Sequence, residues 1–372
     1  MRKLFALTLM ATVALPTMAF AGRYSSSTKI YVQQSNWEKA LQSIEKWKNE
    51  DPKSAEPYLW EGYVYTRMEK YTDAARAFMD AYKKDSTVFL DHRKFEKKLS
   101  ITGQNLMNVN ALSISLQNAV IQYYNEQKYD DALKVAEFLV KVNPNYAQAY
   151  QVLTTLYQIK AQQAENDSIA LAYIDKARQA LEKYYHMNPD DPRANYFLGV
   201  FYYQEASSLI AKGDTTNGNA KLRKAVELLK KAMELGYKDA YYDLGLALSD
   251  LGKNDEAIEY LKKAAENNPD NFEIWFNLAV VAIKAGDKET ALEALKKAHE
   301  IKPDDYTTNY LLSVLLTEKK NYEDALKYVN DAIAIKETPE AYEQKAIILR
   351  ELGRKSEAIK AIEKAEKLKK GK

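Results

Sequence analysis

The stretch YYDLGLALSDLGKNDEAIEYLKKAAENNP, residues 241–269, decides the fold of this chain, because the segment that follows repeats its pattern. That segment is WFNLAVVAIKAGDKETALEALKKAHEIKP, residues 275–303. A step of about 34 residues separates Gly252 from Gly286, Pro269 from Pro303, and the successive alanines Ala257, Ala291 and Ala325, with Ala358 following one position early. A period of this length predicts a stack of similar units instead of two or three unrelated globular domains.

The same period occurs near the N-terminus, where it separates Ala40 from Ala74 and Trp37 from Tyr71. The residue types within one period predict two helices joined by a short turn. Alanine allows two helices to approach closely, glycine permits the turn between them, and proline ends the second helix.

These motifs resemble the tetratricopeptide repeat, whose pattern is an aromatic residue, Leu-Gly, Tyr, and then Ala, a large residue, Ala and Pro. The resemblance implies an all-α, right-handed α-solenoid in which each unit is a pair of antiparallel helices. Applied along the chain, the pattern predicts about nine units, which begin near residues 21, 55, 113, 147, 192, 238, 272, 306 and 339.

Three breaks in the spacing indicate insertions. The steps from Ala74 to Ala132, from Ala132 to Ala177 and from Ala177 to Ala225 are all longer than one period. The last two place extra residues between the helices of a pair, near 161–168 and 207–219, with polar turns at 165–168 and 213–219. These pairs should be longer, as a plain elongated hairpin or as a protrusion that contacts a partner.

The first break divides the mature chain into two units over 22–88, an inserted segment at 89–112 and a main array of seven units over 113–372. We expect the inserted segment to be one amphipathic helix that interrupts the array and ends in a turn at Thr102 and Gly103. It is a degenerate half-repeat, a hinge, or a basic contact patch formed by Arg93, Lys94, Lys97 and Lys98.

The N-terminus has the layout of a secretory signal peptide over residues 1–21. Arg2 and Lys3 precede an apolar run, and Ala19-Phe20-Ala21 ends the segment with small residues at the cleavage positions. We therefore expect cleavage before Gly22 and export to the periplasm or beyond; an uncleaved membrane anchor is the alternative. The chain contains no cysteine, so lipidation of an N-terminal cysteine and disulfide bonds are excluded. No later segment is apolar enough to be a membrane candidate.

Charge and motifs argue against nucleic-acid binding and catalysis. The net charge of +2 falls to zero when Arg2 and Lys3 are removed, which leaves no electrostatic excess for nucleic acid. The three histidines, His92, His186 and His299, have no metal-ligand spacing, and no nucleophile elbow or phosphate-binding loop is present. We expect no enzyme activity, no cofactor and no metal.

The resemblance implies that extended peptides bind on the inner face of the superhelix, which the first helices line. Steps of four and three residues select one face of each first helix. In units five to eight this face is apolar and aromatic, whereas in units three and four it is richer in amides. The groove residues that we predict are Tyr63, Gln117, Tyr124, Gln151, Gln158, Tyr196, Tyr203, Tyr242, Phe276, Ile283 and Tyr310.

Val200, Leu246, Val280 and Val314 alternate with these residues, and we assign them mainly to packing between units. The expected partner is a protein or peptide with apolar or aromatic side chains and not an acidic tail, because the lysine and asparagine clamp of some family members is absent. The expected function is a non-catalytic scaffold or adaptor of the cell envelope. The alternative is a structural component that self-associates through its ends or outer face.

Overall fold

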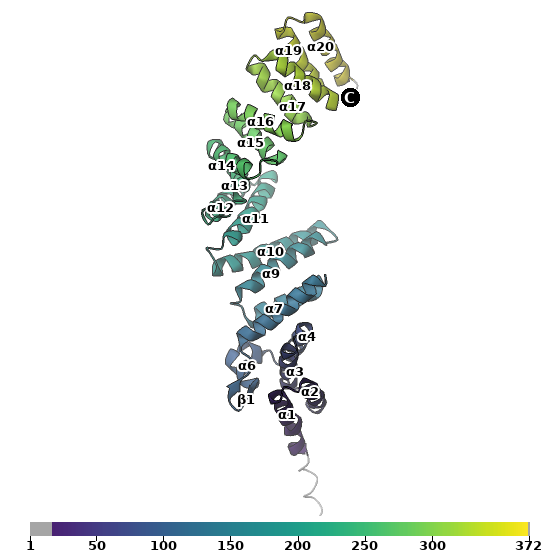
Figure 1. Cartoon of the computed structure of the whole chain (residues 1–372), viewed down its shortest axis with the longest axis vertical. Helices are drawn as coiled ribbons and strands as arrows, with labels where there is room; N and C mark the ends of the chain where they lie inside the picture. The colour runs from purple at the N-terminus through teal and green to yellow at the C-terminus, as the bar shows by residue number, and fades with distance from the viewer. Residues whose placement is uncertain (1–16, 371–372) are drawn as a thin grey trace, which may run out of the picture. The chain divides into compact units, whose positions relative to one another are not determined.

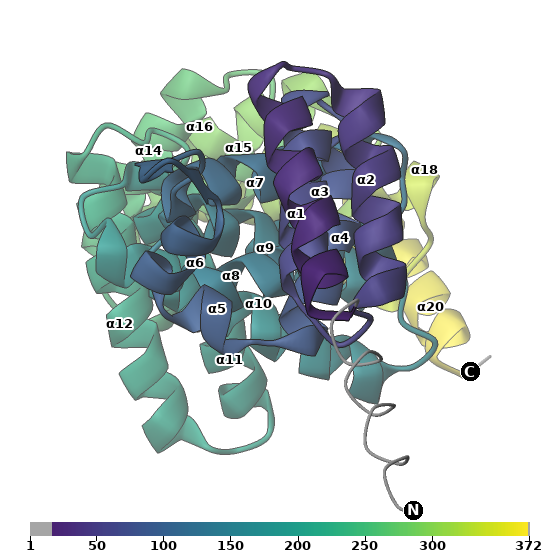
Figure 2. The same ribbon diagram turned by 90° about the horizontal axis from the view of Figure 1, so that it is seen from below.

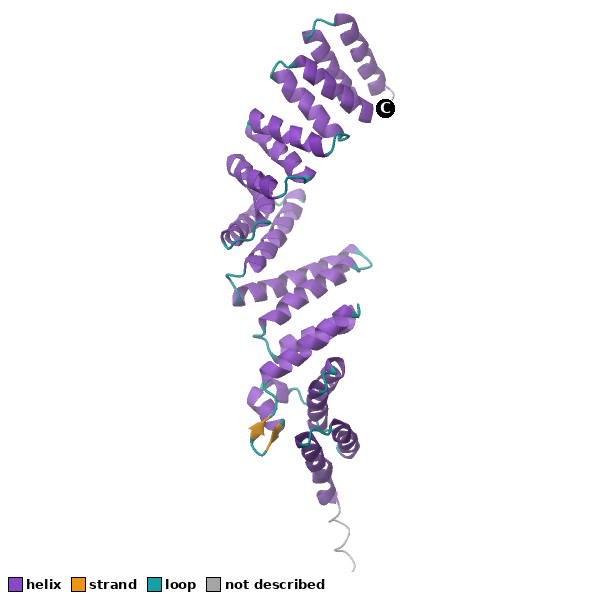
Figure 3. Cartoon of the chain, in the orientation of Figure 1, coloured by secondary structure: helices purple, strands orange, loops and turns teal. Residues whose placement is uncertain are grey.

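The computed structural model describes residues 17–370, and helix pairs make up almost all of this range (Figures 1 and 3). The chain divides into two compact units, 1–188 and 189–372. Unit 1 contains, as pairs, α1 (Thr17–Gln33) with α2 (Trp37–Glu50), α3 (Glu56–Arg67) with α4 (Tyr71–Lys84), α7 (Val109–Asn125) with α8 (Tyr129–Val142), and α9 (Ala147–Gln162) with α10 (Asp167–Met187).

Unit 2 contains five further pairs. They are α11 (Pro192–Ala211) with α12 (Thr215–Glu234), α13 (Ala240–Asp250) with α14 (Asn254–Asn267), α15 (Phe272–Ala285) with α16 (Lys288–Ile301), α17 (Tyr306–Glu318) with α18 (Tyr322–Ile335), and α19 (Pro339–Glu351) with α20 (Lys355–Lys370). The all-α fold of about nine tandem helix pairs is therefore confirmed. Within each unit, the second helix of a pair also packs against the first helix of the next pair.

Glycine lets the two helices of a pair approach closely at one position of the first helix. A Cβ atom built on Gly245 would lie 2.6 Å from Leu261 Cγ, and one on Gly62 would lie 2.6 Å from the Phe78 ring. Gly199 has the same relation to Leu229. Phe78 follows Gly62 by the same number of residues as Leu261 follows Gly245, whereas Leu229 follows Gly199 by many more. The extra residues of the α11–α12 pair therefore lie in its own hairpin.

The prolines that close the repeats also position the next helix. α14 ends two residues before Pro269, because proline has no amide hydrogen to continue the helix. The carbonyl of that proline then accepts a hydrogen bond of 2.8 Å from Trp275 Nε1, six residues later. Asn195 makes the same bond to Pro189, and Asn309 to Pro303. Two of the carboxylates that follow these prolines, Asp191 and Asp305, cap α11 and α17 through the backbone amides of Ala194 and Thr308, as expected for helix N-termini.

The segment 89–112 differs from the single helix that we expected. It contains the end of α5 (Thr87–Leu90), then α6 (His92–Lys98) and a two-stranded antiparallel hairpin of β1 (Ser100–Ile101) and β2 (Gln104–Asn105), drawn in orange in Figure 3. Asp91 breaks the helix because its backbone is extended and its side chain caps α6. The turn is at Thr102 and Gly103, as predicted, and both have positive φ angles.

The inserted segment does not interrupt the stack of helices either. Phe89 and Phe95 are buried, and the Phe89 ring meets Phe138 of α8 at 5.7 Å. The segment is thus anchored on the side of unit 1, while α4 packs directly against α7. This direct packing keeps the pairs on either side of the insertion in one compact unit.

Both insertions within pairs lengthen their helices, as Figure 2 shows for the hairpin of α11 and α12. Both polar turns are shorter than expected, since α10 already begins at Asp167, within the predicted turn at 165–168. α12 begins at Thr215, because Asp214 accepts a hydrogen bond from the Asn217 amide and caps the helix. The residues from Thr215 to Asn219 therefore belong to the helix and not to a turn.

Within residues 17–370, no helix is both long enough and apolar enough to cross a membrane. The predicted signal peptide lies largely outside the described residues. α1 begins at Thr17, so the expected cleavage site before Gly22 falls within this helix. The rest of α1 still carries Thr28 and Val32, both of which are buried.

Candidate functional site

The first helices of unit 2 carry the candidate site. α11 contacts α13, α13 contacts α15, and α17 contacts α19, so the first helices of these pairs lie side by side. We call their shared surface the first-helix face. It consists of the half-buried side chains Tyr196, Val200, Tyr203, Tyr242, Leu246, Phe276, Val280, Tyr310 and Val314, together with Ile283, which is exposed.

The hydroxyl groups of the α11 tyrosines bind the next first helix. Tyr196 donates a hydrogen bond of 2.8 Å to Asp243, and Tyr203 donates one of 2.9 Å to Asp250, both on α13. These bonds hold each ring in one orientation, so less side-chain entropy is lost when a ligand packs against it.

Tyr242 continues this arrangement one repeat later, because its hydroxyl accepts a hydrogen bond of 2.6 Å from Asn277 of α15. Phe276, beside Asn277, stacks on Phe272 with ring centroids 5.7 Å apart. Tyr242 and Phe276, both among the predicted groove residues, are therefore half-buried and supported by neighbours. Val200 and Leu246, which we assigned to packing, lie against the core of unit 2.

The tyrosine bonds also bring carboxylates onto a face whose predicted residues are uncharged. Burial raises the pKa of Asp243, and the hydrogen bond from Tyr196 partly opposes this rise. Burial and the neighbouring carboxylates raise the pKa values of Tyr196 and Tyr203, so both tyrosines stay protonated and remain donors at neutral pH. The end of the face formed by α11 and α13 is thus aromatic and locally acidic.

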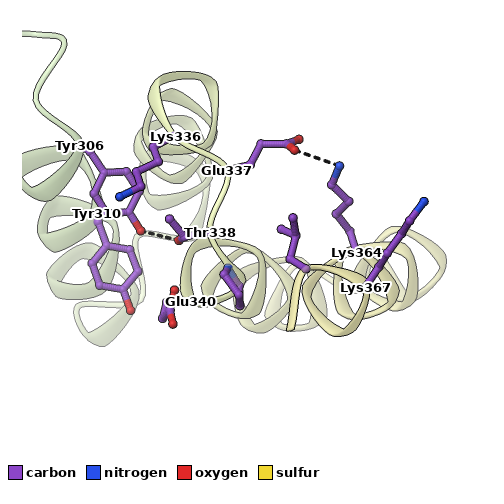
Figure 4. Close-up of a pocket in the computed structure, with 10 residues that line it drawn as sticks. Tyr306, Tyr310, Lys336, Glu337, Thr338, Glu340, Lys364 and Lys367 are labelled. Atoms are coloured by element: carbon purple, nitrogen blue, oxygen red, sulfur yellow. Dashed lines mark hydrogen bonds and ion pairs between the residues drawn. The ribbon is translucent and has the colours of Figure 1, made fainter. Parts of the chain in front are cut away.

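A cleft of about 710 Å³ lies beside the other end of the face (Figure 4). Tyr306 and Tyr310 of α17 form one wall, the connection from Lys336 to Glu340 crosses it, and Lys364, Lys367 and Leu368 of α20 complete it. The rings of Tyr306 and Tyr310 stack with an interplanar angle of 8°. Of the predicted groove residues, Tyr310 is the one that lines this cleft.

Hydrogen bonds and an ion pair hold the cleft in shape. The hydroxyls of Tyr306 and Thr338 are 2.6 Å apart, and Glu337 pairs with Lys364 at 3.0 Å, as Figure 4 shows. Tyr342 donates a further hydrogen bond to Glu337; this bond, followed by the Lys364 ion pair, lowers the pKa of that carboxyl group. Lys336 and Lys367 form no ion pair among the described residues, so their charges remain available to a ligand.

The predicted residues in unit 1 form a different surface. Gln117 accepts a hydrogen bond from Tyr146, whereas Gln151 and Tyr124 are exposed and Gln158 is half-buried. Ile114 and Ile121 are also exposed on α7, at 54% and 45%. The face is therefore less dominated by amides than we predicted. Ile114 was missed because it lies three residues before Gln117, just outside the set that we selected.

Tyr63 is not a groove residue, which corrects the prediction. Only 8% of it is exposed, and its ring packs edge-on against Trp60 at 6.2 Å. Burial raises the pKa of its hydroxyl. Tyr63 contributes to the core of unit 1 and has no surface to offer a partner.

The basic segment on α6 is partly neutralised. Lys98 pairs with Glu56 at 3.0 Å and Lys94 with Asp85 at 3.5 Å, which leaves Arg93 and Lys97 exposed without an ion pair among the described residues. His92 Nε2 lies 3.1 Å from the Val142 carbonyl oxygen and connects α6 to α8. This contact gives His92 a structural role.

No group of three or more histidine, cysteine or carboxylate side chains in the described part of the chain is arranged to hold a metal ion. His186 and His299 lie in the last turns of α10 and α16, where a partial positive charge is favourable. The His299 ring meets Tyr328 edge-on at 5.2 Å.

Sequence models of known families match much of the chain. Three tetratricopeptide-repeat models match residues 242–306, 282–348 and 339–371, and the model of regulator of microtubule dynamics protein 1-3 matches residues 122–273. No curated protein sequence matches the chain.

Solved structures resemble parts of the chain at low identity. A crystal structure of MamA is 22% identical, covers 43% of this chain and 95% of its own, and has a TM-score of 0.39. YrrB, described as a tetratricopeptide-repeat protein with an unusual peptide-binding site, is 21% identical, covers 54% of this chain and 92% of its own, and has a TM-score of 0.42. Since both TM-scores are low, the family assignment rests on the sequence models.

Proposed function

Since this chain is a tetratricopeptide-repeat protein, we propose that it is a non-catalytic scaffold of the cell envelope, which holds an extended protein segment on the first-helix face of unit 2. The observation that carries the proposal is the row of aromatic rings on α11, α13 and α15. The hydroxyls of Tyr196, Tyr203 and Tyr242 all bond to the following first helix. Rings held in this way present apolar area at low entropic cost, and buried aromatic residues are frequent hot spots of binding.

The chemistry of the face favours a partner with apolar or aromatic side chains. Burial of apolar surface stabilises a complex by about 25 cal/mol for each square ångström, and this contribution depends little on salt. Asp243 and Asp250 disfavour acidic side chains at the α11 end through like-charge repulsion. An acidic tail is therefore a poor ligand for this part of the face.

Selection from a library of random peptides displayed on phage tests the proposal, since it requires no named partner. We expect the purified protein to enrich extended peptides that contain aromatic residues. Truncation of Tyr242 and Phe276 together to alanine should weaken the best selected peptide about 100-fold, as expected when two hot spots are lost. Helix content, measured by circular dichroism, should stay the same because both side chains are only half-buried.

The matched control is the double substitution Gln151→Ala and Gln158→Ala, on the corresponding face of α9 in unit 1. It should leave the affinity of the selected peptide unchanged. If the peptide bound the Tyr242 and Phe276 double variant with full affinity, or lost its affinity in moderate salt, the proposed site would be wrong. The exposed Arg93 and Lys97 would then become the better candidates.

Export is part of the proposal and rests on the signal-like segment at residues 1–21. Mass spectrometry of the protein from its native cells should find Gly22 as the first residue. Recovery of the chain with Met1 to Ala21 intact would contradict cleavage and favour an anchored protein.

A further inference from the structure

The last described helix exposes apolar residues that the other pairs of unit 2 bury. The residue directly after each repeat alanine is almost inaccessible in four successive pairs, with exposed fractions of 9% for Val226, 7% for Ile258, 8% for Leu292 and 8% for Leu326. Ile359 has the same position in α20 and is 57% exposed. An apolar side chain is thus present at this position in all five pairs, but in α20 it is not buried by neighbouring residues.

A second position behaves in the same way. Three residues further along each second helix, Leu229, Leu261, Leu295 and Val329 are all 0% exposed, whereas Ile362 of α20 is 47% exposed. In the preceding pairs, the second helix packs against the first helix of its own pair, where Leu229 faces Gly199 and Leu261 faces Gly245, and also against the first helix of the next pair. Among the described residues, no next pair follows α20.

Two charged residues flank the exposed isoleucines at equal distances. Lys355 lies four residues before Ile359, and Glu366 lies four residues after Ile362, so steps of four, three and four place all four side chains on one stripe of α20. Lys355 and Glu366 are exposed and form no ion pair among the described residues. By helical position, this stripe is separate from the side of α20 that lines the cleft with Lys364 and Lys367.

The stripe is complementary to itself. When two such helices pack antiparallel about a two-fold axis between residues 360 and 361, Ile359 of one copy lies opposite Ile362 of the other. The same axis places Lys355 of each copy opposite Glu366 of the other. A parallel arrangement would instead place Lys355 against Lys355 and Glu366 against Glu366.

From this pattern we infer that two copies of the chain associate through the Lys355–Ile359–Ile362–Glu366 stripe of α20, packed antiparallel. The occupant of the exposed face is a second copy, because the pattern of two apolar layers between two Lys–Glu layers matches its own reverse. The dimer presents two first-helix faces. A partner with two binding segments would then gain affinity through its effective local concentration.

Charge reversal tests the antiparallel dimer. The measurement is sedimentation velocity on the purified full-length protein over a range of concentrations. We expect a monomer–dimer equilibrium for the wild type. Lys355→Glu and Glu366→Lys should each weaken the dimer about tenfold or more, because two attractive layers become repulsive. A mixture of the two single variants should form heterodimers, and the double variant carrying both changes should dimerise again.

Two further variants separate this interface from a general effect of charge or folding. Lys360→Glu changes an exposed charge on α20 outside the stripe and should leave dimerisation unchanged. Ile359→Gln with Ile362→Gln should give a folded monomer, since both side chains are about half exposed. A wild type that stays monomeric at every concentration would overturn the inference. So would a dimer that survives the isoleucine changes, or single variants whose mixture fails to associate.

Discussion

The first helices of the two units use similar residue types in different ways. In unit 2, Tyr196 and Tyr203 bond to carboxylates on the next first helix, and their rings are half-buried. In unit 1, Tyr124 is 39% exposed and packs edge-on against Tyr129 of its own pair, at 5.5 Å. The comparison teaches that spacing along a first helix selects which side chains share a face. The residues of the next helix decide whether those side chains are held.

The largest expected effect tests whether the two units are energetically separate. Ala257 in unit 2 and Ala132 in unit 1 are equivalent repeat alanines, and both are fully buried. Substitution of either by leucine should overpack the contact between its helices and lower the free energy of unfolding by about 1–3 kcal/mol. Hydrogen exchange should show loosening near the altered pair, because repeats interact with their neighbours. Uniform loosening from Trp37 to Leu352 in either variant would contradict this view.

A smaller effect sharpens the comparison between the tyrosines. Tyr196→Phe removes the hydroxyl that donates a hydrogen bond to the half-buried carboxylate of Asp243. This change should lower the free energy of unfolding by about 1–2 kcal/mol. Tyr203→Phe should reduce it by about 0.5 kcal/mol, since water can replace the hydroxyl at the exposed Asp250. Tyr124→Phe in unit 1 is the control and should have no measurable effect. Urea denaturation measures all three, and equal losses for Tyr196 and Tyr124 would show that the bonds between helices do not distinguish the two units.

The smallest expected effect concerns pH. Burial raises the pKa of Asp243 in the folded protein above its ordinary value of 3.8, so the folded state binds this proton more tightly than the unfolded state does. Stability therefore falls as pH rises from about 3.8 through the folded-state pKa. Across this pH window, the melting temperature of the wild type should fall relative to that of Asp243→Asn. Above the window, the two melting temperatures should change with pH in parallel.

Asp250→Asn removes an exposed carboxylate of the same helix and serves as the matched control for the pH experiment. Its melting temperature should follow that of the wild type across the window. If the wild type and Asp243→Asn instead gave parallel curves from acid to neutral pH, burial would not perturb Asp243 in solution.

Much of the fold could be predicted because its determinants are local. Alanine, glycine and proline recur at fixed intervals, and each acts within one helix or one turn. Helix start positions follow from the same logic, as Asp191 and Asp305 show by capping the helices that they precede. The segment 89–112 was predicted less well, since one capping residue, Asp91, and a two-stranded hairpin break a pattern that resembles a single helix.

The sequence by itself therefore determined the all-helical class, the number of pairs, the places where pairs are lengthened and the aromatic character of the first helices in unit 2. Only the tertiary structure decided that Tyr63 is buried, that the hydroxyls of Tyr196 and Tyr203 are bound, and that Ile359 is exposed while Leu326 is covered. The physical reason is that helix formation and turns depend on neighbours in sequence. Burial and hydrogen-bond partners depend instead on which side chains the adjacent pair presents, and the same residue type at the same repeat position can meet a carboxylate, a ring or solvent.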